Sequence, residues 1–503
     1  MKNLNLVPIL LIILMTVGAQ ATAKAEHWPT WRGPDRMGVS PAGNPPLKWS
    51  ETENIKWKVK LNGDASNSSP IIWGDKIFFQ TAVDTKIQDD TPVAASMPNP
   101  HMRMTGGGMG RPGGEARGPR QPGRPGQPAR PAQPGRPGQP RRPDQPGRPG
   151  APGGRPSSRG SRGGGFGRSM SPPSTQYKFN LVCLDRKTGS TLWEETVCQV
   201  KPHQGHHGDH GFASFSPVTD GAYVWASYGS RGIYCYDVNG KKIWSKELPL
   251  MRTMFGEGGA PCIAGNAVIV LCDHSGDSTV FAFNKKTGEI LWKKTRDEAT
   301  SYATPLPITV DGRLQVIVSA TNKVRSYDAQ TGDIIWECGG QTSNVVPTPV
   351  IGDGIVYCTS GFRGSALQAI TLGKTGDLTD TDAVVWTAKK DTPYVPSPLL
   401  YDGRLYVCSV NKEVISCYNA KTGSPLFAKQ TLDGLKGVYA SPTAAAGRIY
   451  FVGRNGVTSV LKASDSLEVL ATNTLDDSID CSPAFIGDEM YLKGKQYLYC
   501  IAR

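Results

Sequence analysis

The chain has 503 residues and a formal net charge of +13, which at first suggests a nucleic acid or another polyanion as its partner. The charge is local, however. Residues 101–175 hold 14 Arg and no Lys against only Glu115 and Asp144, so the rest of the chain is close to neutral. A domain that binds nucleic acid carries its basic residues on the folded surface. The sequence therefore disfavours a specific nucleic-acid-binding protein.

The first 25 residues have the pattern of a secretory signal peptide. One lysine precedes an apolar run over residues 4–19, and small residues suited to cleavage follow it. The alternative is an N-terminal membrane anchor. The first cysteine is Cys183, so the sequence does not predict a lipoprotein. We expect an exported protein of the periplasm or cell envelope, and its association with the envelope stays open.

Residues 26–46 form an entry segment, and a repeat begins after it. A Ser/Thr/Ala-Pro step occurs eight times, and each step precedes a glycine-containing turn and an apolar run, as in TPVIGDGIVYCTS from Thr348. After the first interval the spacings are 44, 44, 44, 49, 44 and 41 residues. Such regular spacing indicates an array of similar units. The prolines of the eight steps are Pro70, Pro217, Pro261, Pro305, Pro349, Pro398, Pro442 and Pro483.

A second pattern follows six of the steps: a short strand, usually Asp or Asn, a glycine-containing turn, and a strand ending in a large apolar residue. Examples are CLDRKTGSTLW from Cys183 and SYDAQTGDIIW from Ser326. Glycine supplies the positive φ of a tight hairpin, and proline, which lacks an amide hydrogen, suits the free edge of a sheet. Each unit is thus predicted to be four short strands. Its outermost strand carries the large residue, which packs between neighbouring units: Trp193, Trp244, Trp292, Trp336, Trp386 and Phe427.

The two ends of the chain complement each other. The last residues, KQYLYCIAR, match a third strand with no fourth after it, and Asn54–Leu61 matches a fourth strand with no third before it. Pairing Tyr497–Ala502 with Ile55–Leu61 closes eight units of about 46 residues each into a ring. The predicted fold is an all-β, eight-bladed β-propeller of four-stranded blades. Two separate β-sandwiches are the alternative.

A low-complexity insert at 85–175 divides the propeller into 47–84 and 176–503. Its residues 101–175 include 20 Gly and 16 Pro, so the insert cannot bury a core and is predicted to be disordered. Glycine recurs there with a period of three, but interruptions of that period disfavour a collagen triple helix. The arginines suit contact with acidic glycan, nucleic acid or anionic lipid. A tolerated loop expansion is the alternative, and the composition favours it.

The motif Asp/Asn-x-x-Thr-Gly-x-x-x-Trp resembles the tryptophan-docking repeat of pyrroloquinoline quinone (PQQ)-like β-propellers. That family includes quinoprotein alcohol dehydrogenases and the outer-membrane assembly lipoprotein BamB. The resemblance covers Leu47–Asp84 and Tyr177–Arg503, and WPTWRGPDRMG from Trp28 resembles an entry segment of exported members. It implies the propeller fold. It implies no single activity, because the same ring carries both enzymes and scaffolds.

Candidate ligand-binding residues are predicted on one face of the ring, where the first strands begin and the second-to-third loops lie. Arginines on such a face suit an anionic ligand, which they hold through paired hydrogen bonds. Solvent-exposed turn arginines are the alternative. The predicted ligand-binding residues are Arg231, Glu257, Arg325, Arg363, Arg454 and Lys495.

A metal site is the second hypothesis for the same face. The segment HQGHHGDHGF and the loop LCDHSGDS bring imidazoles close to carboxylates, which are ligands for zinc and other transition metals. Loop histidines that bind only water are the alternative. The candidate metal ligands are His203, His206, His207, Asp209, His210, Asp273 and His274. The eleven cysteines recur at matching repeat positions, which favours small buried side chains over metal ligands.

The sequence thus predicts a monomeric, non-catalytic propeller that binds a protein partner or a small anionic ligand at its funnel. The alternative that the resemblance implies is a PQQ-dependent dehydrogenase. In those enzymes a vicinal disulfide covers the quinone and calcium accompanies it. This chain has no Cys-Cys pair and no C-x-x-C-H haem site, so no catalytic residue is predicted. No cofactor is assigned; PQQ with calcium, or a transition metal, stays open.

Overall fold

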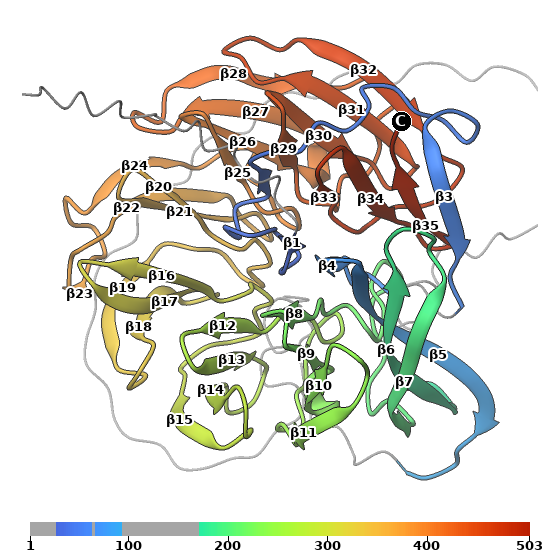
Figure 1. The fold of residues 1–503 in the computed structure, drawn as a ribbon. Coiled ribbons are helices and arrows are strands. Elements are labelled where there is room, and N and C mark those ends of the chain that lie inside the picture. The colour runs from blue at the N-terminus through green and yellow to red at the C-terminus, as the bar shows by residue number, and fades with distance from the viewer. Residues whose placement is uncertain (1–26, 63–65, 93–170) are drawn as a thin grey trace, which may run out of the picture. The chain divides into compact units, whose positions relative to one another are not determined.

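Eight sheets surround a common axis in the described part of the chain (Figure 1). The computed structural model describes residues 27–62, 66–92 and 171–503. The predicted signal peptide and most of the predicted insert lie outside these residues. We number the sheets as blades 1 to 8 by the chain order of their first strands. The fold is an eight-bladed β-propeller, as predicted.

The blades follow one another along the chain, each with its first strand innermost. Blade 1 contains β4 (Ile71–Trp73), β5 (Lys76–Gln88), β6 (Thr175–Asp185) and β7 (Thr191–Val200). Blade 2 contains β8 (Val218–Thr219), β9 (Tyr223–Ser227), β10 (Ile233–Asp237) and β11 (Lys242–Lys246). Blade 3 contains β12 (Cys262–Ala264), β13 (Ala267–Cys272), β14 (Thr279–Asn284) and β15 (Ile290–Thr295). Blade 4 contains β16 (Leu306–Val310), β17 (Arg313–Ser319), β18 (Lys323–Asp328) and β19 (Ile334–Gly339).

The second half repeats this order. Blade 5 contains β20 (Val350–Gly352), β21 (Ile355–Ser360), β22 (Ala366–Thr371) and β24 (Val384–Ala388), and its enlarged turn adds β23 (Gly376–Asp377) to the edge of blade 4. Blade 6 contains β25 (Leu399–Tyr401), β26 (Arg404–Ser409), β27 (Val414–Asn419) and β28 (Pro425–Gln430). Blade 7 contains β29 (Thr443–Ala445), β30 (Arg448–Val452), β31 (Val457–Lys462) and β32 (Val469–Thr474). Blade 8 contains β33 (Ala484–Ile486), β34 (Glu489–Lys493), β35 (Tyr497–Ile501) and β3 (Ile55–Lys60).

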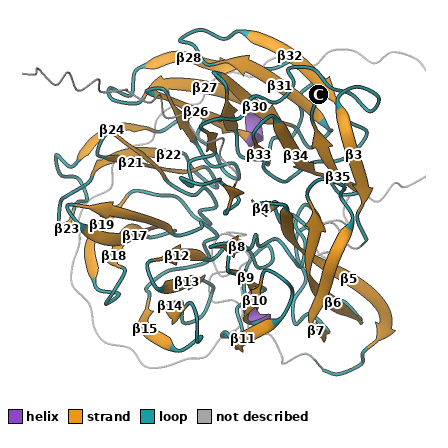
Figure 2. Cartoon of the chain, in the orientation of Figure 1, coloured by secondary structure: helices purple, strands orange, loops and turns teal. Residues whose placement is uncertain are grey.

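Strands account for nearly all the regular structure of the described residues (Figure 2). The helical turns there are the single 3-10 turns Gly229–Arg231 and Val410–Lys412. Among the described residues, the search for a helix long and apolar enough to span a membrane finds none. In blade 1, β5 continues to Gln88, which pairs with Thr175, so the ordered hairpin extends past the predicted boundary at Asp84.

The ring closes by pairing the two ends of the described chain. Strand β3 lies antiparallel to β35, with Ile55 opposite Ile501 and Lys60 opposite Tyr497. This is the pairing that the sequence predicted. Blade 8 is therefore built from two segments that are more than 400 residues apart in the sequence. Their pairing closes the ring.

The repeated Asx-Thr-Gly-Trp motif joins neighbouring blades, as between blades 3 and 4. In blade 4, the Asp328 carboxylate accepts the Thr331 amide at 2.9 Å and closes the turn. Gly332 has φ +72°, and a Cβ there would lie 2.6 Å from the indole of Trp292 in blade 3. That indole donates its N–H to the Ala329 carbonyl of blade 4 at 3.0 Å. The glycine thus permits the turn and the tryptophan contact together.

The hydrophobic cores lie between adjacent blades. One cluster joins Tyr450 of blade 7 to Phe485 and Tyr491 of blade 8, and it continues to Phe79 of blade 1. All eleven cysteines are unpaired, and all except Cys198 are buried. The buried cysteines pack as small apolar side chains, as their repeat positions predicted.

A ring of hydroxyl groups encircles the axis. The residue before each repeated proline sits directly ahead of the innermost strand, and its backbone N–H donates to the hydroxyl of the equivalent residue in the next blade. Seven such bonds of 2.9–3.3 Å are present, and the eighth is missing because Ala260 has no hydroxyl. We call this set the hydroxyl ring: Ser69, Ser216, Thr304, Thr348, Ser397, Ser441 and Ser482.

Completing the hydroxyl ring is expected to stabilise the propeller. In Ala260→Ser, the new hydroxyl can accept the Ser216 N–H, and one added neutral hydrogen bond is worth about 1 kcal/mol in the free energy of unfolding. Urea denaturation of the variant and the parent chain measures this difference. Ala226→Ser, a fully buried position within β9, is the matched control and should destabilise the fold. An unchanged or reduced stability in Ala260→Ser would contradict the role assigned to the ring.

The entry segment crosses the centre of the ring (Figure 1). It begins with β1 (His27–Trp28), which pairs with β4, and it includes β2 (Val39–Ser40), which pairs in parallel with β29. The segment also contacts each of the six remaining blades. The contacts are Pro29 with Thr219, Arg36 with Ile263, Trp31 with Thr304, Met37 with Ile351, Arg32 with Pro398, and Trp28 with Phe485.

Arg32 holds this segment in place. Its guanidinium is fully buried and donates to the carbonyls of Met37, Pro398 and Pro442 at 2.7–2.9 Å. Burial lowers the pKa of Arg32 to about 9. Most contacts of the whole entry segment with the blades are made by residues that follow the repeated prolines, namely Thr219, Ile263, Ile351 and Phe485. The segment therefore closes the channel on the far side of the hydroxyl ring from the loops that precede the prolines.

Candidate functional site

A cavity of about 320 Å³ lies on the ring axis, lined by residues from all eight blades. The hydroxyl ring forms one end, where Trp31 of the entry segment donates its indole N–H to Thr304 Oγ1 at 3.2 Å. The loops before the repeated prolines form the walls. The carboxylates lining it are Asp209 and Asp480. The cavity is thus a pocket bounded by the entry segment rather than an open channel.

Aromatic side chains cover much of the cavity wall. Phe362 stacks on Tyr394 with ring centroids 5.0 Å apart, and Phe255 meets Phe362 edge-on at 5.5 Å and 85°. Tyr302 and Tyr439 complete the set. Burial raises the pKa of Tyr439 to about 12, so its phenol stays neutral at physiological pH. The wall therefore offers flat, uncharged ring faces.

Arg454 joins the two carboxylates of the cavity. It binds Asp209 at 2.7 Å and Asp480 at 2.6 Å, and its guanidinium lies 4.3 Å from the centroid of the Tyr439 ring. The Tyr439 hydroxyl donates to Asp209 at 3.1 Å. These contacts fasten the loop containing Asp209, which precedes blade 2, to blade 7 across the mouth of the ring. Arg454 is thus placed at the predicted face, but its charge is already balanced by two carboxylates.

His210 presents a neutral imidazole to the cavity. Its Nδ1 lies 2.9 Å from the Gly211 carbonyl, which can only accept, so Nδ1 carries the hydrogen. Burial lowers the pKa of His210 to about 4. Its Nε2 is consequently an unprotonated acceptor at neutral pH. The neighbouring His207 also lines the cavity and lies 3.6 Å from Asp209.

The structure brings Arg231 and Glu257 together, but as an ion pair inside the protein. Arg231 donates to Glu257 at 3.1 Å, and the Ser230 N–H and hydroxyl donate to the same carboxylate at 2.8 and 2.7 Å. Nε2 of His203 lies 3.4 Å from Glu257 and 2.7 Å from the Met251 carbonyl. These contacts tie the long loops before blades 2 and 3 to one another.

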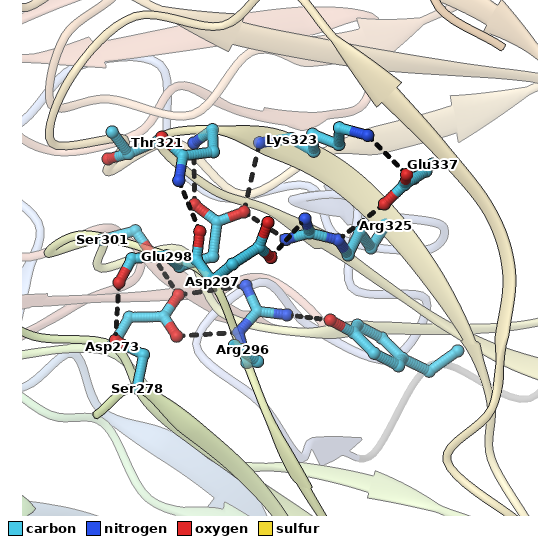
Figure 3. Close-up of polar contacts among 12 residues, drawn as sticks. Asp273, Ser278, Arg296, Asp297, Glu298, Ser301, Thr321, Lys323, Arg325 and Glu337 are labelled. Atoms are coloured by element: carbon cyan, nitrogen blue, oxygen red, sulfur yellow. Dashed lines mark hydrogen bonds and ion pairs between the residues drawn. The ribbon is translucent and has the colours of Figure 1, made fainter. Parts of the chain in front are cut away.

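Asp273 and Arg325 belong to a buried network between blades 3 and 4 (Figure 3). Asp273 binds Arg296 through two hydrogen bonds of 2.8 and 3.1 Å, and both side chains are fully buried. Arg325 meets Asp297, Glu298 and Glu337. Burial raises the pKa of Glu298, although Arg296 and Arg325 oppose this shift. The network fills the interface between the blades and does not line the cavity.

The remaining predicted residues lie apart from one another. Arg363 is exposed, with its guanidinium 5.3 Å from the Phe362 ring centroid, and the Lys495 backbone N–H donates to Asp477. His274 accepts the Gly276 N–H at 2.9 Å, and burial lowers its pKa. His206 Nδ1 lies 2.8 Å from the His207 carbonyl. Within the described ranges, no three His, Cys, Asp or Glu side chains converge as a metal site, and metal binding stays a prediction.

Comparison with known families identifies the repeat. The model of the family described as outer membrane protein assembly factor BamB, a PQQ-repeat family, matches residues 178–377. That match runs from β6 of blade 1 to β23 in the enlarged turn of blade 5, so it includes all of blades 2 to 4. The chain is a PQQ-like β-propeller.

Individual relatives of this PQQ-like propeller are distant. A tetrathionate hydrolase of Acidithiobacillus ferrooxidans is 24% identical over 308 residues, which are 56% of this chain. The chain spans 55% of the length of that relative. Among solved structures, BamB from Moraxella catarrhalis is 15% identical over 66% of this chain and 90% of its own, with a TM-score of 0.47. The designed Ika8 protein is 14% identical over 67% of this chain and 94% of its own, with a TM-score of 0.46.

Sequence reasoning missed the aromatic wall of the propeller's cavity. A signal was present, because a tyrosine stands three or four residues before the repeated proline in three units, at Tyr302, Tyr394 and Tyr439. Those positions precede the innermost strand, so they project at the mouth of the ring. The entry segment was noted as a motif, but nothing in its own composition indicated that it crosses the axis.

Proposed function

We propose that this propeller is a non-catalytic binding module that holds a small organic molecule in its central cavity. The observation that carries the proposal is the 320 Å³ cavity, bounded by the entry segment and walled by aromatic rings. Concave, largely apolar sites with a few polar groups are the usual form of a small-molecule site. The neutral His210 Nε2 and the hydroxyl ring supply those polar groups.

The charges in the cavity support a ligand other than the predicted small anion. Arg231, Arg325 and Arg454 each face carboxylates within the protein, so an anion would have to displace those partners. Exposed Arg363 lacks this constraint, but it does not line the cavity. A neutral or cationic molecule fits these charges better.

The PQQ-dependent dehydrogenase alternative does not fit the same residues. PQQ carries three carboxylates, and the calcium that accompanies it needs oxygen ligands. The described residues that line the cavity include two carboxylates and no lysine or arginine, and both carboxylates are already bound to Arg454. We therefore derive no redox step. Added PQQ with calcium and an alcohol should give no dye reduction.

We place the protein in the periplasm or cell envelope. The pattern of residues 1–25 supports export, and the matched family is described as an outer membrane assembly factor. A protein-assembly role, in which a partner's loop enters the same cavity, is distinguished from small-molecule binding by the experiment below.

Blocking the cavity is expected to abolish ligand binding without unfolding the ring. Val346 lines the cavity, and Val346→Trp fills it with a bulky side chain. Saturation-transfer NMR with a library of aromatic, amine and sugar fragments should detect binding to the parent chain and not to the variant. Val469→Trp, on the exposed outer strand of blade 7, is the matched control and should bind like the parent.

Two results would contradict the proposal. The first is equal fragment binding by Val346→Trp and the parent, which would place the site elsewhere. The second is the absence of any bound fragment together with loss of a protein partner in Val346→Trp, recovered by pull-down with the parent chain. That second result would favour the assembly role.

A further inference from the structure

One part of the cavity wall presents hydroxyl hydrogens that no described residue accepts. Each hydroxyl of the hydroxyl ring accepts a backbone N–H, and a hydroxyl also has one hydrogen to donate. Five members donate to no described residue: Ser216, Thr348, Ser397, Ser441 and Ser482. All five line the cavity and are only 2–8% exposed. A buried donor without an acceptor costs free energy, so this part of the wall favours a molecule with several acceptor oxygens.

Other lining residues present acceptors. Nε2 of His210 carries no hydrogen, because Nδ1 donates its own to the Gly211 carbonyl at 2.9 Å. The carboxylates of Asp209 and Asp480 have about four acceptor sites each, and their bonds within the protein use only some of these sites. A molecule in the cavity therefore needs both acceptor and donor atoms. A hydroxyl group supplies both.

The charges around the cavity favour a neutral molecule. Asp209 and Asp480 share the Arg454 guanidinium. Burial raises the pKa of Asp480, and the charges of Arg454 and Lys495 oppose that rise, so two carboxylates face two cations. Arg363 is exposed and does not line the cavity. A charged ligand would find no unpaired opposite charge among the described lining residues, and burying it would cost free energy.

The size of the cavity and the rest of its wall fit one sugar ring. The volume of about 320 Å³ equals roughly ten water molecules at about 30 Å³ each, which is close to the number of non-hydrogen atoms in a monosaccharide. Apolar lining side chains, among them Val346, Val395 and Phe255, can pack against the C–H groups of such a ring. A monosaccharide combines these C–H groups with hydroxyls around its edge.

We propose that the cavity binds one neutral monosaccharide. Its oxygens accept from the hydroxyl ring, and its hydroxyls donate to His210 Nε2 and to the carboxylates of Asp209 and Asp480. Its C–H groups lie against the apolar side chains. This inference rests on the proposed binding function and names the ligand class for it.

Isothermal titration calorimetry of the full chain with D-glucose, D-galactose and D-mannose tests the ligand class. At least one of the three sugars is expected to bind. Its amino-sugar and uronic-acid counterparts keep the sugar ring but carry a positive or a negative charge, so they isolate the effect of charge. Both should bind at least about tenfold more weakly, because each would bury a charge that has no free partner in the cavity.

Ser397→Ala tests the hydroxyl ring. It removes one donor from the cavity, and the ring already accommodates alanine at Ala260. The bound sugar should lose about fivefold in affinity, the effect of one neutral hydrogen bond. Ser416→Ala is the matched control, because the Ser416 hydroxyl is also buried and accepts the Lys429 N–H at 3.1 Å, but it does not line the cavity. It should leave the affinity unchanged. His210→Phe, which removes an acceptor and keeps an aromatic ring, should weaken binding by a similar factor.

Each outcome decides between the two proposals. If none of the three sugars binds while fragments of another class do, the inference is wrong and the binding function stands. Equal affinity for the neutral sugar and a charged counterpart would also overturn it, because the cavity would not select a neutral ligand. Equal losses in Ser397→Ala and Ser416→Ala would show that the hydroxyl ring does not hold the sugar. If no small molecule binds, water alone fills the cavity and the proposed function fails as well.

Discussion

Deletion of residues 497–503 is expected to abolish cooperative folding of the ring. The deleted strand β35 contributes Leu498, Tyr499, Cys500 and Ile501, all fully buried between β34 and β3. Burying one large apolar side chain contributes about 1.5–3 kcal/mol, so losing Leu498, Tyr499 and Ile501 alone approaches the whole stability of a domain, about 5–15 kcal/mol. The deletion also leaves the edges of β34 and β3 unpaired. Near-ultraviolet circular dichroism during thermal unfolding measures the loss.

The control for this deletion removes Arg503 alone. Arg503 is exposed and lies beyond β35, so its removal should leave the unfolding temperature unchanged. If the seven-residue deletion unfolds cooperatively at the parent temperature, blade 8 does not hold the ring shut. The seven neighbouring blades would then be sufficient for a stable open ring.

The fold was predictable because the signals that specify it are local and repeated. The glycine turn, the Asx side chain that closes it and the tryptophan that packs on the equivalent turn of the next blade all fall within 11 residues, as in CLDRKTGSTLW from Cys183. Closure was predictable because each end of the chain carries a strand pattern that lacks its partner. Neither inference required knowledge of which residues meet across the ring.

The site was less predictable because its contacts join distant parts of the chain. Arg454 was expected to face the funnel, and its partner Asp209, 245 residues away, was assigned to a metal site instead. Asp273 was assigned to the same metal site, and its partner Arg296 stands at the end of a strand with no recognisable motif. Charge balance between such residues depends on blade packing. A sequence motif gives the position of a side chain on its blade and not the charge that it faces.

The aromatic wall of the cavity was also hard to predict from the sequence. Tyr302, Tyr394 and Tyr439 are unremarkable within their own units, where a tyrosine shortly before a strand needs no explanation. Only the eightfold arrangement brings them to one cavity with Phe255 and Phe362. The residues that line the cavity are therefore found by comparing equivalent positions across the blades, because no single segment contains them all.

Removing one member of the buried Asp273–Arg296 pair is expected to cost far more than removing both. In Arg296→Met, Asp273 stays buried without its cation, which should lower the free energy of unfolding by about 3–5 kcal/mol. In the double variant Asp273→Leu/Arg296→Met, no buried charge is left unpaired, and much of that loss should be recovered. Urea denaturation of the parent, both single variants and the double variant gives the coupling energy of the pair.

An exposed pair provides the comparison that makes this result specific. Lys294 and Asp333 lie 2.8 Å apart, with side chains 39% and 65% exposed, so Asp333→Asn should change the free energy of unfolding far less than Arg296→Met does. If Arg296→Met costs as little as Asp333→Asn, water reaches Asp273 and the interface between blades 3 and 4 is not closed. If the double variant is no more stable than Arg296→Met, the loss comes from packing rather than from the unpaired carboxylate. A large loss in the single variant that is recovered in the double variant would establish that these two charges stabilise the interface only as a pair.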